Sequence, residues 1–312
     1  MNKRIKGCLL VAASAVLFGF YPIVAKYAYA GGANAVTMLL LKGVGLLPLG
    51  LWGFLDKRVN MRVAPGKELR DVSISAVVGA TCTPLLLLSS YAFISAGTAT
   101  TLHYLYCVLT VVLCVVFYHD PFDKRKGLCV ALCMGGVALL FAPKETGGAL
   151  GVALALGSAF TYAFYAVFLE KSGLHAMPPV KLQFYSLVVS TAAAAVYGLI
   201  SGNLVFDLTP GVWAVALGYY GVGSILASVF FQKGVHLIGS QGAAILSTLE
   251  PLTSVLLGIF LFQEALTLRS AIGIAVILAA AVLITCMDGA DEKKRAEKAE
   301  EASAEPYTNS QH

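Results

Sequence analysis

Charged side chains are scarce in this sequence. Asp, Glu, Lys and Arg make up only 12% of its 312 residues, whereas 58% are apolar, and the mean hydropathy is +0.79. Soluble domains carry about 25% charged residues. The composition therefore excludes a soluble globular enzyme, a nucleic-acid-binding protein and a disordered protein. It predicts an all-α integral membrane protein with many spans.

Sequence motifs for catalysis are also absent. The chain contains no H-E-x-x-H, no G-x-S-x-G and no G-x-x-x-x-G-K-[ST] pattern. We therefore expect neither an enzyme nor an ATP-driven pump, and no cofactor. Any energy for transport must then come from a gradient.

The seven cysteines all lie in or beside apolar runs. They are Cys8, Cys82, Cys107, Cys114, Cys129, Cys133 and Cys286. Buried thiols behave as small hydrophobic residues, so we expect no disulfides. Cys129 and Cys133 share a helix face, but without His or carboxylate neighbours this spacing predicts packing rather than a metal site.

Length and apolarity predict ten membrane-spanning helices. A span needs about 20 predominantly apolar residues. The ten lie at residues 5–29, 34–55, 72–95, 98–118, 125–142, 148–170, 180–200, 211–232, 239–262 and 267–287. The first run is too long for the apolar core of a cleaved signal peptide, so we expect it to be a true span.

The distribution of Lys and Arg predicts the orientation. With the N-terminus in the cytoplasm, 18 basic residues fall in inside segments, and only Lys144 and Arg269 fall in outside segments. Cytoplasmic loops carry an excess of Lys and Arg, so both termini are expected inside, in a cytoplasmic (inner) membrane. Residues 288–312 hold 11 of the 39 charges and cannot form a core, which predicts a solvated, disordered tail.

A constant offset of 144 residues relates the two halves of the chain. Matched pairs include Gly7/Gly151, Ser14/Ser158, Tyr21/Tyr165, Gly79/Gly223, Ile94/Ile238 and Arg125/Arg269. The repeats cover residues 5–142 and 148–287, with five spans each. Because five is odd, the second repeat is expected to enter the membrane from the opposite side. Inverted repeats of this kind are typical of secondary transporters.

The ninth span carries the most specific motif in the sequence. The motif L-S-T-L-E-P-L-T-S-V-L-L-G-I-F-L-F-Q-E-A-L-T-L contains Glu250-Pro251 and ends near Glu264, and Phe18-Gly19, Lys26 and Lys42 lie in the first two spans. Together with the five-plus-five pattern, these residues resemble the drug/metabolite transporter superfamily, in particular its EamA-type members.

The resemblance implies a ten-helix transporter that exports or exchanges small organic metabolites, amino acids among them. Two positions of the first half depart from the family pattern. Cys107 stands where the family often has proline, and Asp120 stands where it has glutamate. These departures leave the resemblance to the superfamily intact, but they weaken any inference from it about the substrate.

Ionisable and polar groups inside the predicted spans mark the candidate site. Placing a charged side chain at the bilayer centre costs about 2.5–3.5 kcal/mol of free energy. Each such residue is therefore a candidate for a specific role. The exceptional residues are Lys42, His103, Gln183 and Glu250.

Helical spacing gathers further polar residues onto shared faces. His103, Tyr106 and Thr110 match Ser247, Glu250 and Ser254 in the other repeat, and Ser14, Phe18 and Tyr21 match Ser158, Tyr162 and Tyr165. Lipid offers no hydrogen bonds, so spans 1, 4, 6 and 9 are expected to line one central cavity. The third span (Thr81, Thr83, Pro84) and the eighth (Tyr220, Ser224, Ser228) are expected to add to its walls.

We expect substrate to be bound by nine residues of these spans. They are Tyr21, Lys42, His103, Tyr106, Tyr162, Tyr165, Gln183, Ser247 and Glu250. Glu250 and His103 are also candidates for proton coupling. Purely structural roles are the alternatives: hydrogen-bonded neutral groups for Glu250 and His103, an ion pair with Glu250 for Lys42, and packing for the tyrosines.

These residues favour a secondary transporter with a small-molecule substrate. A cationic Lys42 opposite an anionic Glu250 suits a zwitterion such as an amino acid. Broad-specificity efflux of hydrophobic cations is the alternative within transport, and a passive channel or a membrane-embedded enzyme is the alternative outside it. The small-residue-rich helices at 125–142 and 267–287 are expected to serve as packing or homodimer faces.

Overall fold

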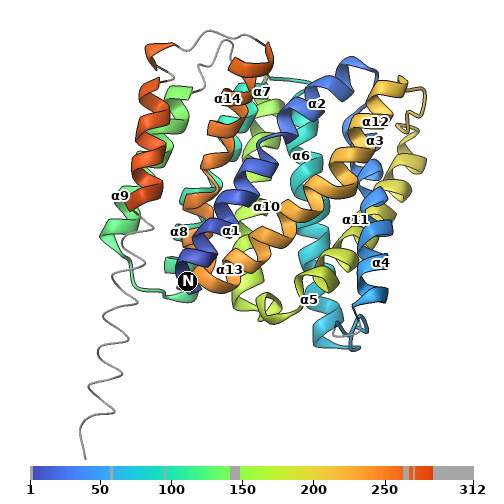
Figure 1. Cartoon of the computed structure of the whole chain (residues 1–312), viewed down its shortest axis with the longest axis horizontal. Helices are drawn as coiled ribbons and strands as arrows, with labels where there is room; N and C mark the ends of the chain where they lie inside the picture. The colour runs from blue at the N-terminus through green and yellow to red at the C-terminus, as the bar shows by residue number, and fades with distance from the viewer. Residues whose placement is uncertain are drawn as a thin grey trace, which may run out of the picture.

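The computed structural model describes residues 3–56, 59–94, 96–140, 148–262, 267–269 and 271–283. Within these ranges the chain forms helices and connecting loops and no strand, as Figure 1 shows. The all-α prediction is therefore confirmed for the described residues. Glu264, Lys144 and the tail at 288–312 lie outside the described residues.

Eleven helical elements lie within the described residues of the first half. They are α1 (Lys3–Phe18), α2 (Tyr21–Ala30), α3 (Ala35–Leu41), η1 (Lys42–Gly45), α4 (Leu46–Leu55), α5 (Lys67–Ser75), η2 (Ala76–Cys82), α6 (Thr83–Ser90), α7 (Ala96–His103), α8 (Tyr106–Tyr118) and α9 (Lys124–Leu140). The element η1 is a 3-10 helix and η2 is a π-helix.

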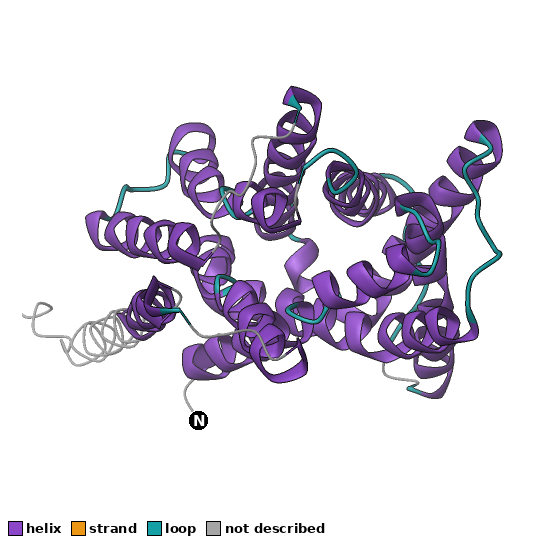
Figure 2. Cartoon of the chain, turned by 90° about the horizontal axis from the view of Figure 1, so that it is seen from above, coloured by secondary structure: helices purple, strands orange, loops and turns teal. Residues whose placement is uncertain are grey.

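The second half repeats this order with longer helices. Its elements are α10 (Ala149–Lys171), η3 (Leu174–Ala176), α11 (Pro179–Ser201), α12 (Pro210–Gly218), η4 (Tyr219–Gly223), α13 (Ser224–Leu246) and α14 (Leu249–Phe262). A further apolar helix follows at Ala271–Leu283. Figure 2 shows the bundle from above, with the helices seen nearly end-on.

Local sequence explains where several of these helices begin. The Asn34 side chain accepts a hydrogen bond from the Thr37 backbone N–H at 2.9 Å, and Thr209 caps α12 in the same way. Both side chains satisfy a backbone donor that the first turn leaves without a partner. Pro179 and Pro210 open α11 and α12, where the missing proline N–H costs nothing.

In the part of the chain that the structure describes, seven helical stretches are long and apolar enough to cross a membrane. They are Lys3–Ala30, Ala35–Leu55, Lys67–Ser90, Thr98–Tyr118, Ala149–Lys171, Pro179–Ser201 and Pro210–Leu246. The remaining expected spans fall on shorter helices, namely α9 with 17 residues, α14 with 14 residues and the Ala271–Leu283 helix. The count of ten spans therefore stays a prediction.

The expected span at 239–262 is interrupted in the structure. Gly239 has φ 77° and ψ 168°, which breaks the helical backbone, and a second break separates α13 from α14. A positive φ is accessible to glycine without the steric cost that a side chain brings. The first helix of this span therefore begins at Ser240, directly after the bend.

Helices are interrupted in the middle of several spans, and the interruptions recur in both halves. The chain leaves the helix at residues 104–105 and again at 247–248, which the 144-residue offset places at nearly the same point. The same offset carries η2 onto residues 220–226, which overlap η4. A further break at 19–20 separates α1 from α2. Irregular backbone at membrane depth is tolerated where it lies inside the protein or lines a cavity.

Two close contacts between the halves are also related by this offset. A Cβ atom on Gly7 of α1 would lie 2.6 Å from Ile238 Cγ2, and a Cβ atom on Gly151 of α10 would lie 2.8 Å from Ile94 Cγ2. Gly7 and Ile238 are related to Gly151 and Ile94 by the offset of 144. Figure 1 shows α1 running beside α13, the pairing to which the first of these contacts belongs.

The expected packing role of α9 is visible at Gly136. A Cβ atom there would lie 2.6 Å from Ile277 Cγ1 and 3.0 Å from the Gly273 carbonyl oxygen, both on the Ala271–Leu283 helix. One face of each helix is thus used within the chain. A homodimer through these two helices stays a prediction for their exposed faces, where Leu128 and Val282 lie.

Gly136→Ala is expected to destabilise the protein, because the added methyl group meets backbone that cannot move aside. Overpacking of this kind costs about 1–3 kcal/mol. The neighbouring Gly135→Ala is the matched control, since no atom lies within 4 Å of its Cβ position. Thermal unfolding in detergent should show a lower Tm for the first variant and an unchanged or higher Tm for the second. Equal Tm values would contradict the packing seen here.

Candidate functional site

The helix interruptions surround a cavity of about 110 Å³. Its walls come from the broken ends of α1, α2, α7 and α14, from η1 and η2, and from α6, α10 and α13. The lining residues are Phe18, Tyr21, Lys42, Gly79, Thr83, Pro84, Leu87, His103, Tyr162, Ser224 and Glu250. Residues from both halves of the chain therefore meet in one place.

Five of the nine expected binding residues line this cavity, namely Tyr21, Lys42, His103, Tyr162 and Glu250. The expected wall residues Thr83, Pro84 and Ser224 line it as well. Gly79 and Leu87 were not anticipated from the sequence. Gly79 allows a close approach, because its Cβ would lie 2.3 Å from the ring of Tyr165. The match of Gly79 with Gly223 in the second repeat is the sequence feature that could have indicated its importance.

The other four expected residues lie away from the cavity lining. Tyr106 packs behind it, with its ring centroid 5.3 Å from His103 and 4.6 Å from Tyr162. Ser247 donates to the Ala243 carbonyl at 2.9 Å within its own helix.

Tyr165 and Gln183 belong to a separate polar cluster that forms around Gln232. The Gln232 Nε2 atom donates to Gln183 Oε1 at 3.2 Å and to the Tyr165 hydroxyl at 3.4 Å. The sequence reading did not single out Gln232. It is the centre of this cluster because it reaches both partners from α13.

The expected continuous polar faces are interrupted in the structure. His103 ends α7 and Tyr106 begins α8, so these residues and Thr110 do not follow one straight helix. Ser247 and Glu250 are likewise separated by the break before α14. The breaks expose side chains at helix ends to the cavity, which a continuous stripe on a regular helix would not do.

Lys42 lies on η1 and is partly buried at the cavity wall. Within the described residues, its ammonium group takes part in no hydrogen bond and no ion pair, and no contact within 4.0 Å joins it to Glu250. The structure therefore does not show the alternative, in which Lys42 forms an ion pair with Glu250. A lysine without a partner at membrane depth is costly for stability.

Glu250 occupies the first turn of α14, where the helix dipole favours a negative charge. Tyr104, at the break between α7 and α8, lies close to the Glu250 carboxyl group. Tyr104 itself is almost fully buried, with 1% of its surface exposed. The carboxyl group thus lies at the start of its own helix and close to a buried tyrosine.

His103 is oriented by α10. Its Nδ1 atom lies 2.9 Å from the Ser158 hydroxyl oxygen. The rings of Tyr104, Tyr106 and Tyr162 surround it, with centroids 5.3–6.0 Å away. This side of the cavity therefore combines an imidazole, a carboxyl group and aromatic rings.

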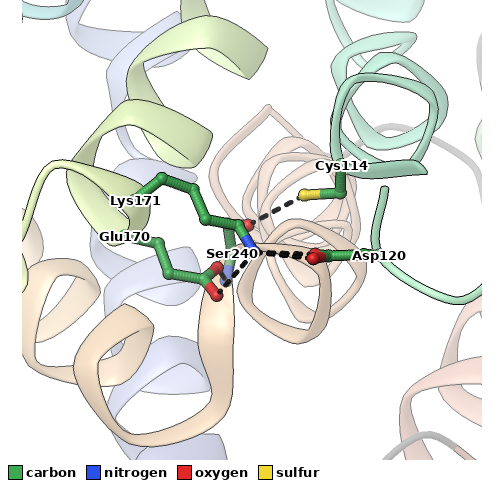
Figure 3. Close-up of polar contacts among 5 residues, drawn as sticks. All are labelled: Cys114, Asp120, Glu170, Lys171 and Ser240. Atoms are coloured by element: carbon green, nitrogen blue, oxygen red, sulfur yellow. Dashed lines mark hydrogen bonds and ion pairs between the residues drawn. The ribbon is translucent and has the colours of Figure 1, made fainter. Parts of the chain in front are cut away.

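A cluster of charged residues joins the two halves at the end of the bundle where α1 begins. Lys171 Nζ lies 2.9 and 2.8 Å from the two carboxylate oxygens of Asp120 and 3.8 Å from Glu170 Oε1 (Figure 3). Glu170 also accepts a hydrogen bond from the Ser240 backbone N–H at 2.5 Å. The Glu170 carboxylate therefore caps the helix that starts after Gly239. The cap comes from α10 and not from a side chain next to the start of that helix. Asp120 thereby links the end of α8 to the end of α10.

A second ion pair joins the halves at the same end. Lys181 Nζ lies 2.6 Å from Glu68 Oε1, at the starts of α11 and α5. The two pairs hold both sides of the connection between α10 and α11 against the first half. We refer to Lys171–Asp120 and Lys181–Glu68 together as the clamp.

Comparison with known proteins identifies the family. The sequence model of the EamA-like transporter family matches residues 5–142 and 149–286. The chain belongs to the EamA-like transporter family. The two matches cover almost all of the described bundle and coincide with the two halves that the 144-residue offset defines.

Similar proteins come from bacteria and archaea. An uncharacterized transporter of Synechocystis is 26% identical over 88% of this chain and 92% of its own length. The uncharacterized inner membrane transporter YicL of Salmonella typhimurium is 26% identical over 96% of this chain and its whole length. A solved crystal structure with 15% identity superposes with a TM-score of 0.78 over 90% of this chain and 96% of that chain, which shows a shared fold. The chain is therefore a transmembrane protein of a transporter family.

Proposed function

We propose that this protein is a secondary transporter that moves small organic metabolites across a cytoplasmic membrane by alternating access. The observation that carries the proposal is the cavity in which Lys42 and Glu250, from different halves, line the same space. In secondary transporters, substrate sites lie between repeats and are built from discontinuous helices. The breaks at 104–105 and 247–248 are of this type.

The repeated contacts support an inverted repeat. The Gly7–Ile238 and Gly151–Ile94 crossings and the overlap of η2 with η4 are what two copies of one five-helix unit would produce. Ten spans with both termini in the cytoplasm follow from this arrangement and from the distribution of Lys and Arg. The clamp would then lie on the cytoplasmic side.

A small zwitterion, such as an amino acid, fits the cavity best. Lys42 offers an unpartnered cation to a carboxylate, and Glu250 offers a counter-charge to an amine. The volume of about 110 Å³ is below the roughly 300–1,000 Å³ of pockets for drug-sized ligands, which disfavours bulky hydrophobic cations. Glu250 and His103 are the groups through which proton coupling would act.

Counterflow in proteoliposomes tests the proposed function. Vesicles preloaded with one amino acid are expected to accumulate the labelled amino acid transiently, with a rate that saturates. A thermal-shift screen of amino acids and hydrophobic cations selects the substrate, because a ligand of the folded state raises apparent stability. Non-saturating flux would indicate a channel, and product formation would indicate an enzyme.

Lys42→Gln is expected to have opposite effects on stability and on transport. Removing an unpartnered charge from membrane depth should leave the Tm unchanged or raise it. Losing a hydrogen bond to a charged group costs about 1.5–3 kcal/mol, so the half-saturation concentration of the zwitterion should rise about tenfold or more. The control is Lys233→Gln on the exposed surface of α13. An unchanged half-saturation concentration would remove Lys42 from the site.

A further inference from the structure

The hydroxyl group of Ser158 has two hydrogen-bond contacts that constrain each other. Its oxygen lies 2.6 Å from the Ala155 carbonyl oxygen and 2.9 Å from His103 Nδ1. A carbonyl oxygen can only accept, so the single hydroxyl proton of Ser158 must point to Ala155. The oxygen of Ser158 is then an acceptor for its other partner. Both residues are largely buried, with 9% of His103 and none of Ser158 exposed.

This arrangement decides which nitrogen of His103 carries the proton. For both contacts to be hydrogen bonds, Nδ1 must be the N–H donor, and in a neutral imidazole Nε2 is then an acceptor. A neutral ring is favoured because His103 is buried, and a buried charge at membrane depth is costly. Within the described residues, no protein donor occupies Nε2.

The surroundings of Nε2 suit a positively charged N–H group. Glu250 lines the same cavity and supplies negative charge. The ring of Tyr162 also lines the cavity, with its centroid 5.5 Å from that of His103, and aromatic faces attract ammonium groups. An acceptor, a carboxyl group and an aromatic ring thus lie on the side of the cavity formed by α7, α10 and α14.

We infer that this side of the cavity is an amine subsite that requires an N–H bond, and that Ser158 acts as its positioning residue by fixing the tautomer of His103. The inference rests on the proposed function, since it names the substrate group that the transport site would recognise. Primary and secondary ammonium compounds would bind, whereas quaternary ammonium compounds have no proton to donate to Nε2. Charge alone would not make this distinction.

Nitrogen NMR of the full-length, ¹⁵N-histidine-labelled protein in lipid tests the tautomer without any ligand. The difference between the spectra of the wild-type protein and His103→Gln isolates the signals of His103 from those of the other histidines. We expect a protonated Nδ1 and an unprotonated Nε2 at neutral pH. In Ser158→Ala the second tautomer should become populated. A protonated Nε2 in the wild-type protein, as a neutral tautomer or an imidazolium, would overturn the inference.

Counterflow of alanine and of N,N,N-trimethylalanine tests the recognition. Both compounds carry a positive nitrogen and a carboxylate, but only alanine has N–H bonds. The wild-type protein is expected to prefer alanine at least tenfold, and Ser158→Ala should reduce this preference severalfold. Equal exchange of the two compounds would overturn the amine subsite and leave the transporter intact. Saturable counterflow of neither compound, nor of any amino acid in the screen, would instead overturn the proposed function.

Discussion

Glu250→Gln is expected to lower the rate of counterflow by about 30-fold or more while the protein still inserts and folds. Glutamine keeps the size of the side chain, and its amide oxygen can still accept a hydrogen bond, so the start of α14 should persist. It removes the negative charge from the cavity, so the ammonium group of the bound substrate loses its counter-charge. Leaving a buried charged partner unpaired costs about 2–5 kcal/mol. The readouts are initial counterflow rates and the Tm of the purified variant.

Asp207→Asn is the matched control for this experiment. Asp207 is exposed in the loop before α12 and lies outside the cavity lining, so its neutralisation should leave transport unchanged. Full counterflow in Glu250→Gln would exclude the carboxyl group from the transport site. A large fall in Tm for Glu250→Gln would instead assign it a structural role.

Breaking the clamp is expected to open the cavity toward the end of the bundle where α1 begins. In the double variant Lys171→Met/Lys181→Met, Asp120, Glu170 and Glu68 lose their cationic partners. These pairs are partly exposed, so the loss of stability should be about 1–3 kcal/mol, between the values for surface and buried pairs. The larger effect should be on access, because the connection between α10 and α11 loses both attachments to the first half.

Labelling of Ser224→Cys with a membrane-impermeant thiol reagent measures this access. Ser224 lines the cavity, and the labelling rate from the clamp side should rise about tenfold in the double variant. The parent chain without the new cysteine corrects for native thiols, and Lys171→Arg/Lys181→Arg keeps the charges as a control. A lower Tm without faster labelling would show that the clamp only stabilises the fold.

Much of the candidate site was predictable from the sequence, because membrane-embedded charges are costly and rare. Lys42 and Glu250 stood out on that ground, and both line the cavity. The 144-residue offset matches the helix face of His103 with that of Glu250, and it matches Tyr162 with Phe18. His103 and Tyr162 were therefore also predicted to belong to the site. Family membership was equally visible, since Glu250-Pro251 lies in the most specific motif.

Other expectations failed because side-chain periodicity assumes regular helices. Ser247 points its hydroxyl group back to Ala243, and Tyr106 lies behind the cavity, since the chain breaks beside each of them. Gln183 faces Gln232 instead of the cavity. No pattern of apolar residues marks a break of one or two residues inside an apolar run.

The sequence by itself determined that this is an all-α membrane protein of a transporter family, with rare charges in its spans. Composition and repeat spacing carry that information, because the hydrocarbon core of the membrane requires apolar side chains along every span. Only the tertiary structure decided that Lys42 has no described partner, that Ser158 lies within hydrogen-bonding distance of His103, and that Lys171 joins the two halves. Such contacts join residues far apart in the chain, and their geometry depends on how the interrupted helices pack.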